Sequence, residues 1–117
     1  MSKSRALVKS FGYAFTGVKE AFKNEPNFKL HVVIGMAALS AAFFLRLERL
    51  EWLILAFTIF FVLIIEMVNT VLEKIVDLAS PEINEKARIA KDVSAAAVLF
   101  SAIMALLVAA VLFIPKL

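Results

Sequence analysis

Two long uncharged segments constrain the fold of this 117-residue chain more than any other feature. Residues 53–65 contain nothing more polar than Thr58, and residues 93–114 carry no charged side chain. Hydrophobic residues make up 62% of the chain, well above the content usual for a soluble domain. A domain of this length lacks the interior volume to bury so much apolar side chain. We therefore expect lipid as the solvent and one all-α integral membrane domain over residues 1–117.

Helical spacing and chain breaks divide the sequence into four predicted helices. Residues 5–23 combine an aromatic face with lysines at helical spacing, which is typical of an amphipathic helix on the membrane surface, although a helix packed on protein has the same pattern. Pro26 and Pro81 mark helix starts, and the charged turn 46–51 separates two apolar runs. The predicted transmembrane segments are residues 28–45, 52–78 and 82–114, the last with a charged lead-in.

Charged residues predict the topology of these helices. Lysine and arginine exceed acidic residues before the first span and are prominent in the connector 80–92, whereas the turn 46–51 is balanced. Short basic segments stay inside, so the N-terminus and this connector of a multi-pass membrane protein are expected in the cytoplasm. No signal-peptide pattern follows the basic start.

Composition also excludes some chemistries. Without cysteine the chain has no disulfide, thiol nucleophile or thiolate metal site. The net charge of +3 does not predict nucleic-acid binding, because the basic residues are not interleaved with aromatic residues on a polar surface. A P-loop is excluded because there is no GxxxxGK motif.

The second predicted span carries Glu66, Asn69, Glu73 and Asp77, which we call the acidic stripe. At about 100° per residue these side chains fall within an arc of roughly 80°, so they share one helical face. They extend over roughly 16 Å, with Glu66 deepest in the membrane. Because a carboxylate in hydrocarbon is costly, the acidic stripe must be hydrated, protonated or paired, and we expect it to have a chemical role.

Phosphoryl transfer is one chemistry that uses such groups. Mg²⁺ binds one or two carboxylates and fills its other positions with water and phosphate oxygens. The reaction also needs a cation on the phosphates and a base beside the acceptor hydroxyl. The candidates for these roles are Glu25, Glu66, Glu73 and Lys91.

Other interpretations stay open at this point. Glu66 alone would suit a small proton-coupled multidrug exporter, and Asp77 with Lys74 or Lys86 would suit a solvated helix end. A non-enzymatic assembly subunit would use the polar residues for helix association only. Because the chain has no second histidine, His31 is expected in a pocket or at the interface rather than as a metal ligand.

Residues 66–77 read EMVNTVLEKIVD, and AKD follows at 90–92 before an alanine-rich run. This pattern, E-x-x-N-[TS]-x-x-E-x-x-x-D and then A-K-D, resembles that of the small prokaryotic lipid kinases, the diacylglycerol and undecaprenol kinases. The similarity extends over nearly the whole chain and includes Asn24-Glu25. It implies ATP-dependent phosphorylation of a membrane lipid alcohol by a homotrimer of three-span subunits whose active sites are shared between neighbours.

The resemblance also implies roles for matched residues. Glu66 is expected to be the catalytic base, with Asn69 orienting groups beside it. Glu25 and Glu73 are expected to hold Mg²⁺ on the ATP phosphates. The other residues expected to contact the nucleotide or organise its site are Tyr13, Asp77, Glu82, Ile83, Asn84, Lys91 and Asp92.

Two positions differ from the diacylglycerol kinases of the enteric type. Ala6 stands where they carry an arginine, and His31 stands where they carry an acid. The features that look more like the undecaprenol kinases of Gram-positive bacteria are Asn27-Phe28 with His31, Leu50-Glu51-Trp52 and the ending 113–117. Undecaprenol is therefore the expected acceptor, giving undecaprenyl phosphate, and diacylglycerol is the alternative, giving phosphatidic acid.

Overall fold

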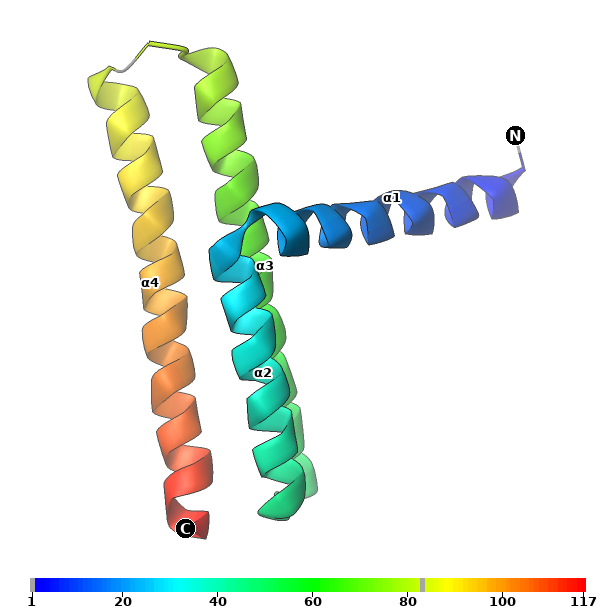
Figure 1. Cartoon of the computed structure of the whole chain (residues 1–117), viewed down its shortest axis with the longest axis vertical. Coiled ribbons are helices and arrows are strands. Elements are labelled where there is room, and N and C mark those ends of the chain that lie inside the picture. The colour runs from blue at the N-terminus through cyan, green and yellow to red at the C-terminus, as the bar shows by residue number, and fades with distance from the viewer. Residues whose placement is uncertain (1, 83) are drawn as a thin grey trace.

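The computed structural model describes residues 2–82 and 84–117 and confirms the all-α prediction for them. The helices are α1 (Lys3–Asn24), α2 (Pro26–Phe44), α3 (Arg49–Ala79) and α4 (Glu85–Phe113), followed by the short 3-10 helix η1 (Ile114–Lys116). Figure 1 shows α2, α3 and α4 side by side along the long axis, while α1 projects sideways from the bundle. Within the described residues, the predicted three helices long and apolar enough to cross a membrane are confirmed as α2, α3 and α4 with η1.

Each spanning helix begins where the local chemistry favours a helix start. Pro26 occupies the first turn of α2, where its missing N–H is not needed. Glu48 and Glu51 form a reciprocal capping box at the start of α3, which therefore begins three residues before the predicted span. The side-chain oxygen of Asn84 accepts a hydrogen bond from the Ala87 N–H (2.9 Å) and caps α4.

The turn between α2 and α3 ends the first span with a complete Schellman motif. The Leu47 N–H donates to the Ala42 carbonyl (3.2 Å), and the Arg46 N–H donates to the Phe43 carbonyl (3.4 Å). Arg46 adopts the left-handed conformation that this motif requires, with φ at 56°. The connection is therefore short and fixed by backbone hydrogen bonds.

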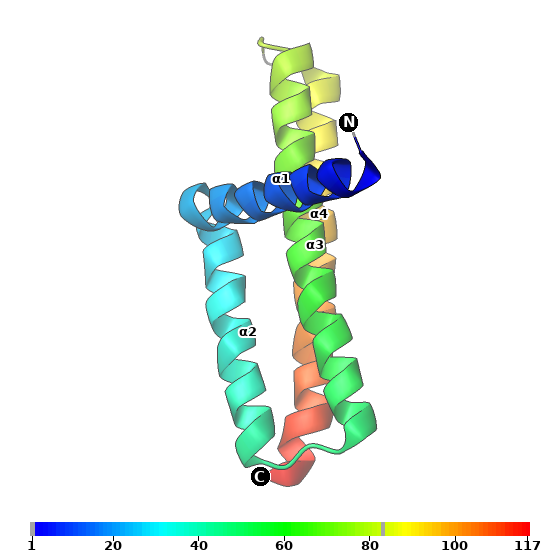
Figure 2. The same ribbon diagram turned by 90° about the vertical axis from the view of Figure 1, so that its right-hand side faces the viewer.

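The main apolar core lies next to this turn, and we call the turn and this part of the bundle the closed end. Its buried members are Ala42, Leu47, Leu55 and Leu112, which come from α2, the turn, α3 and α4. Lys116 Nζ lies 3.1 Å from Glu51 Oε1 and ties the end of the chain to the start of α3. Figure 2 shows the C-terminus beside the α2–α3 turn, in agreement with this contact.

Helix α2 approaches α3 closely in the middle of the bundle. Gly35 is buried there, and a Cβ atom at this position would meet Ile59 Cγ2 at 3.1 Å, tighter than most side-chain contacts. A glycine thus permits the approach that fixes how the two helices face each other.

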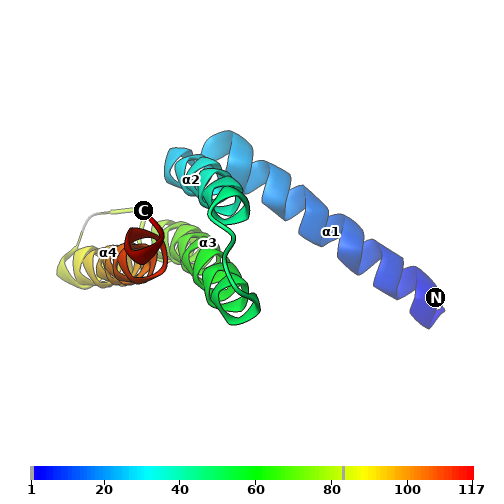
Figure 3. The same ribbon diagram turned by 90° about the horizontal axis from the view of Figure 1, so that it is seen from below.

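Helix α1 meets the bundle only at its C-terminal end. It buries none of its residues within the chain, and Figure 3 shows it extending away from the three clustered spans. Asn24 and Glu25, at the joint with α2, share a cleft with Thr70 and Lys74 of α3. In Figures 1 and 2, α3 and α4 continue past the level of α1, so both helices have a segment beyond this joint.

Candidate active site

The acidic stripe lies along the face of α3 that turns toward α4, and side chains of the neighbouring helices reach it. Ser94 of α4 bonds to Asn69, and Lys91 pairs with Asp77 farther along the helix. At the deep end, α2 supplies the neighbour of Glu66. We call this region, residues 66–82 and 84–94, the open end of the bundle.

Glu66 is the most enclosed acid of the site, with 4% of its surface exposed. Its Oε1 atom lies 3.1 Å from Nε2 of His31, yet it accepts no well-aligned hydrogen bond from any described residue. The Thr70 hydroxyl donates to the backbone carbonyl of Glu66 (3.1 Å) and leaves the carboxylate free. A buried carboxylate oxygen without an aligned donor is unfavourable for stability and available for chemistry.

Asn69 connects α4 with the next acid of the stripe. The Ser94 hydroxyl donates to Asn69 Oδ1 (2.6 Å), and Asn69 Nδ2 donates to Glu73 Oε1 (2.8 Å). The resemblance implies that Asn69 orients groups beside Glu66, and the group that its amide contacts is Glu73, one turn farther out. Ser94 is buried, so this relay fixes the direction of the exposed Glu73 carboxylate.

Glu25 lies at the joint between α1 and α2. It is half-buried and lines a cleft of about 480 Å³ with Thr70 and Lys74 of α3. Among the described residues, no group of three or more acidic or histidine side chains forms a metal cage. Mg²⁺ takes one or two carboxylates and completes its coordination with water and phosphate oxygens, so the half-buried Glu25 and the exposed Glu73 are donors of the suitable chemical type.

Asp77 has a specific partner rather than a purely solvated position. Lys91 Nζ of α4 lies 2.5 Å from Asp77 Oδ1, although both side chains are partly exposed. This contact is an ion pair between α3 and α4, and the partner is Lys91 rather than the alternatives Lys74 or Lys86. It places one cation beside the outer end of the acidic stripe, where a phosphate group would need it.

The predicted nucleotide residue Asp92 pairs with an arginine that the sequence did not single out. Arg88 donates to Asp92 Oδ2 (2.8 Å) and to Glu85 Oε1 (2.5 Å), all on α4. These side chains are more than half exposed, so the pairs add little stability. They do place another cation at the open end.

The remaining predicted nucleotide residues are not gathered in one place. Asn84 caps α4 and donates to the Ser80 hydroxyl (2.5 Å), and Glu82 is exposed beside it. Ile83 lies outside the described residues. Tyr13 is on α1 and 73% exposed, and its hydroxyl makes no hydrogen bond with another described residue.

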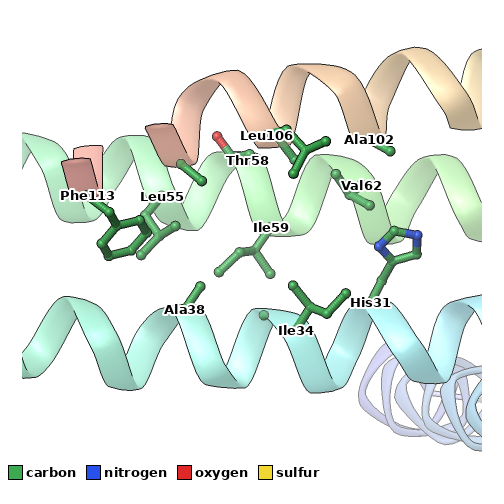
Figure 4. Close-up of a pocket in the computed structure, with 13 residues that line it drawn as sticks. His31, Ile34, Ala38, Leu55, Thr58, Ile59, Val62, Ala102, Leu106 and Phe113 are labelled. Carbon is green, nitrogen blue, oxygen red and sulfur yellow. The ribbon is translucent and has the colours of Figure 1, made fainter. Parts of the chain in front are cut away.

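An apolar groove of about 250 Å³ runs between the three spans, and His31, the neighbour of Glu66, lines it. Figure 4 shows His31 at one end and Phe113 at the other, with Ile34, Ile59 and Leu106 along the groove. The groove therefore joins the neighbour of the buried acid to the apolar core of the closed end. Its shape suits a hydrocarbon chain whose polar group ends near Glu66.

Comparison with known sequences shows the family of this chain. The family model described as prokaryotic diacylglycerol kinase matches residues 12–113, which include the acidic stripe and both flanking spans. The chain belongs to this family. It is thus a member of a family of membrane lipid kinases, and the predicted resemblance is confirmed.

Individual relatives carry both names that the sequence suggested. The chain is 44% identical to the diacylglycerol kinase of Synechocystis sp. over 95% of its own length, but it spans only 64% of that relative. It is 34% identical to the undecaprenol kinase of Bacillus subtilis, covering 93% of the chain and 89% of the relative. It is 31% identical to the diacylglycerol kinase of Escherichia coli, covering 86% of the chain and 83% of the relative. The higher identity to a diacylglycerol kinase does not follow the predicted preference for undecaprenol kinases.

Two contacts of the site had only weak signals in the sequence. Ser94 was one of many small residues suited to helix packing, and its bond to Asn69 spans 25 positions along the chain. His31 was expected in a pocket or at the interface, and the structure places it against Glu66. The spacing of Ser94 after the AKD run was the one local hint that it shares the face of Lys91.

Proposed function

We propose that the protein transfers the γ-phosphoryl group of ATP to the hydroxyl of a membrane lipid alcohol. The observation that carries this proposal is Glu66, a buried carboxylate in contact with His31, which lines the end of an apolar groove. Farther out on the same face of α3, Asp77 is exposed and paired with Lys91 of α4. An acid that meets hydrocarbon on one side and polar groups on the other suits a reaction between a lipid and a nucleotide.

The orientation of the helices supports a site with a deep lipid side and an outer nucleotide side. If α1 lies in the cytoplasmic interface, its aromatic face contacts lipid and its lysines contact headgroups. The segments of α3 and α4 beyond the α1 joint then project from the bacterial inner membrane into the cytoplasm, where ATP is present. The basic N-terminal segment and the basic connector favour the same orientation.

Glu66 acts as the general base in this mechanism. Its carboxylate takes the proton of the lipid hydroxyl while the hydroxyl oxygen attacks the γ-phosphorus, and the bond to the leaving ADP oxygen breaks. The proton then resides on Glu66 until the product leaves. The groove holds the lipid chain and excludes water from the acceptor oxygen.

The outer groups of the acidic stripe position the nucleotide. Glu25 and Glu73 would hold Mg²⁺, which would neutralise charge on the ATP phosphates. Asn69, fixed by Ser94, keeps the Glu73 carboxylate directed for this role. Lys91 offers its charge to the phosphates, and Asp77 holds that ammonium group in place.

A homotrimer would complete the site. Within one chain, Glu73 and Asp77 are exposed, and the Tyr13 hydroxyl has no hydrogen-bond partner among the described residues. A neighbouring subunit that packs on α3 or α4 would enclose the outer acids. The nucleotide contacts expected from Tyr13, Glu82, Ile83, Asn84 and Asp92 would then come from more than one subunit.

The acceptor is either undecaprenol or diacylglycerol, and different observations favour each. Similarity around His31 and at the chain end favours undecaprenol. The 44% identity to a protein named diacylglycerol kinase favours diacylglycerol. We retain undecaprenol as the first candidate because His31 lies in contact with the base, so the replaced position is part of the site.

The substitution Glu66→Gln tests the proposal. We expect phosphoryl transfer from labelled MgATP to lipid to fall by about 10³-fold or more, because the base is lost while the shape is kept. MgATP binding, measured by equilibrium dialysis, should be unchanged. Transfer at the wild-type rate would exclude Glu66 as the base.

A further inference from the structure

His31 is the only histidine of the chain, and the proposed mechanism gives it no task. It lies on α2, with 22% of its side chain exposed, and its Nε2 atom is 3.1 Å from Glu66 Oε1. Figure 4 shows its ring at the end of the apolar groove. It therefore contacts both the buried carboxylate and the space into which a lipid chain would extend.

The surroundings of Glu66 make this contact significant. In the part of the chain that the structure describes, no lysine or arginine nitrogen lies within 4.0 Å of the Glu66 carboxylate. Oε1 is enclosed but lacks an aligned hydrogen bond, so the imidazole approaches it off the hydrogen-bond axis. A small rotation of either side chain would align the donor with the acceptor.

We propose that His31 is a positioning residue for the reaction. Its Nε2–H donates to Glu66 Oε1 when the lipid binds, which fixes the carboxylate plane and leaves Oε2 to take the hydroxyl proton. The inference rests on the proposed function, since it assigns to His31 the orientation of the base. The imidazole itself exchanges no proton in this step, and Glu66 remains the acceptor.

The position of α2 makes this role possible. The close approach at Gly35 sets how α2 faces α3, one helical turn from His31. A histidine that merely filled space would need no carboxylate partner and would tolerate an apolar residue of similar size. A positioning histidine requires a donor at that distance from Oε1.

Kinetics of three variants separate these roles. We expect His31→Leu to lower kcat by about 10- to 100-fold, because a misplaced base slows the chemical step, while the KM for MgATP changes less than about twofold. His31→Gln retains an N–H donor and should recover most of the rate. Ser40→Ala is the matched control, since the Ser40 side chain is exposed and donates only within α2. A wild-type kcat in His31→Leu, or equal losses in the leucine and glutamine variants, would overturn the proposal.

A spectroscopic measurement tests the contact without depending on kinase activity. Because His31 is the only histidine, full-length protein labelled with nitrogen-15 histidine in micelles gives the imidazole signals of one residue. Glu66→Gln should shift the Nε2 resonance, whereas Glu51→Gln, at the closed end of the same helix, should leave it unchanged. Identical imidazole signals in wild type and Glu66→Gln would refute the contact. A wild-type protein that transfers no phosphate but shows the shift would refute the proposed function alone.

Discussion

At the closed end of the bundle Glu51 pairs with Lys116, whereas at the open end Glu66 Oε1 has no aligned donor among the described residues. The closed end combines a buried apolar core with a complete Schellman motif and the Glu51–Lys116 ion pair. The open end buries a carboxylate without an aligned donor and exposes Glu73 on the same helix. Helix α3 thus carries stability at one end and chemistry at the other, since unsatisfied groups persist where function needs them.

The largest effect among substitutions that test this contrast is expected for Glu73→Gln at the open end. Loss of one carboxylate should raise the Mg²⁺ concentration for half-maximal activity by about 10- to 100-fold. A magnesium titration of lipid phosphorylation measures it. Glu51→Gln, the equivalent change at the closed end, should leave the titration unchanged, and an identical curve for both variants would remove Glu73 from the metal site.

Leu112→Ala, at the closed end, is expected to lower stability rather than activity. It should lower the free energy of unfolding by about 2 kcal/mol, because packing in the closed core is lost while lipid solvates the unfolded leucine well. Activity per folded molecule should stay the same. Unfolding in mixed micelles gives the stability, with the exposed Leu107→Ala as the control on the same helix. Equal stability of the two variants would contradict the assignment of the core.

Ser94→Ala should have a smaller effect on activity. Removing its hydroxyl leaves Asn69 without its partner on α4, so the Glu73 carboxylate loses orientation. We expect an activity loss of about fivefold, which corresponds to one hydrogen bond. Ser101→Ala is the control, because Ser101 is also buried on α4 but donates only to the Val98 carbonyl. A loss as large in the control would mean that packing, not the relay, is responsible.

The smallest effect is expected at the turn of the closed end. Arg46 adopts a left-handed conformation that glycine adopts without steric cost. Arg46→Gly should therefore raise the free energy of unfolding by up to about 1 kcal/mol and leave kinase activity unchanged. Arg46→Ala keeps the Cβ atom and should give no such gain. Destabilisation by glycine would argue that the arginine side chain itself holds the turn.

Much of this architecture was predictable because its signals are local. Apolar runs longer than a soluble core accommodates predicted the three spans, and Pro26 marked the start of α2. The helical period also placed Asn69 and Asp77 on one face, which agrees with their contacts to Ser94 and Lys91 of α4. Such features depend only on residues near one another in sequence.

The contacts between helices were not predictable in the same way. The pairing of His31 with Glu66 depends on the rotation of α2 against α3, which the buried Gly35 helps to set. The Ser94–Asn69 bond depends on the register of α4, and a serine in an alanine-rich run gives no sign of its partner. Periodicity defines the face of a helix, but it does not say which helix covers that face.

Phosphoryl transfer by the wild-type protein tests the central claim most directly. Purified protein in mixed micelles would be incubated with labelled ATP and either undecaprenol or diacylglycerol, with and without a chelator of Mg²⁺. We predict Mg²⁺-dependent appearance of label in at least one phosphorylated lipid, with the faster acceptor defining the substrate. Consumption of no ATP, or transfer to neither lipid alcohol, would contradict the account.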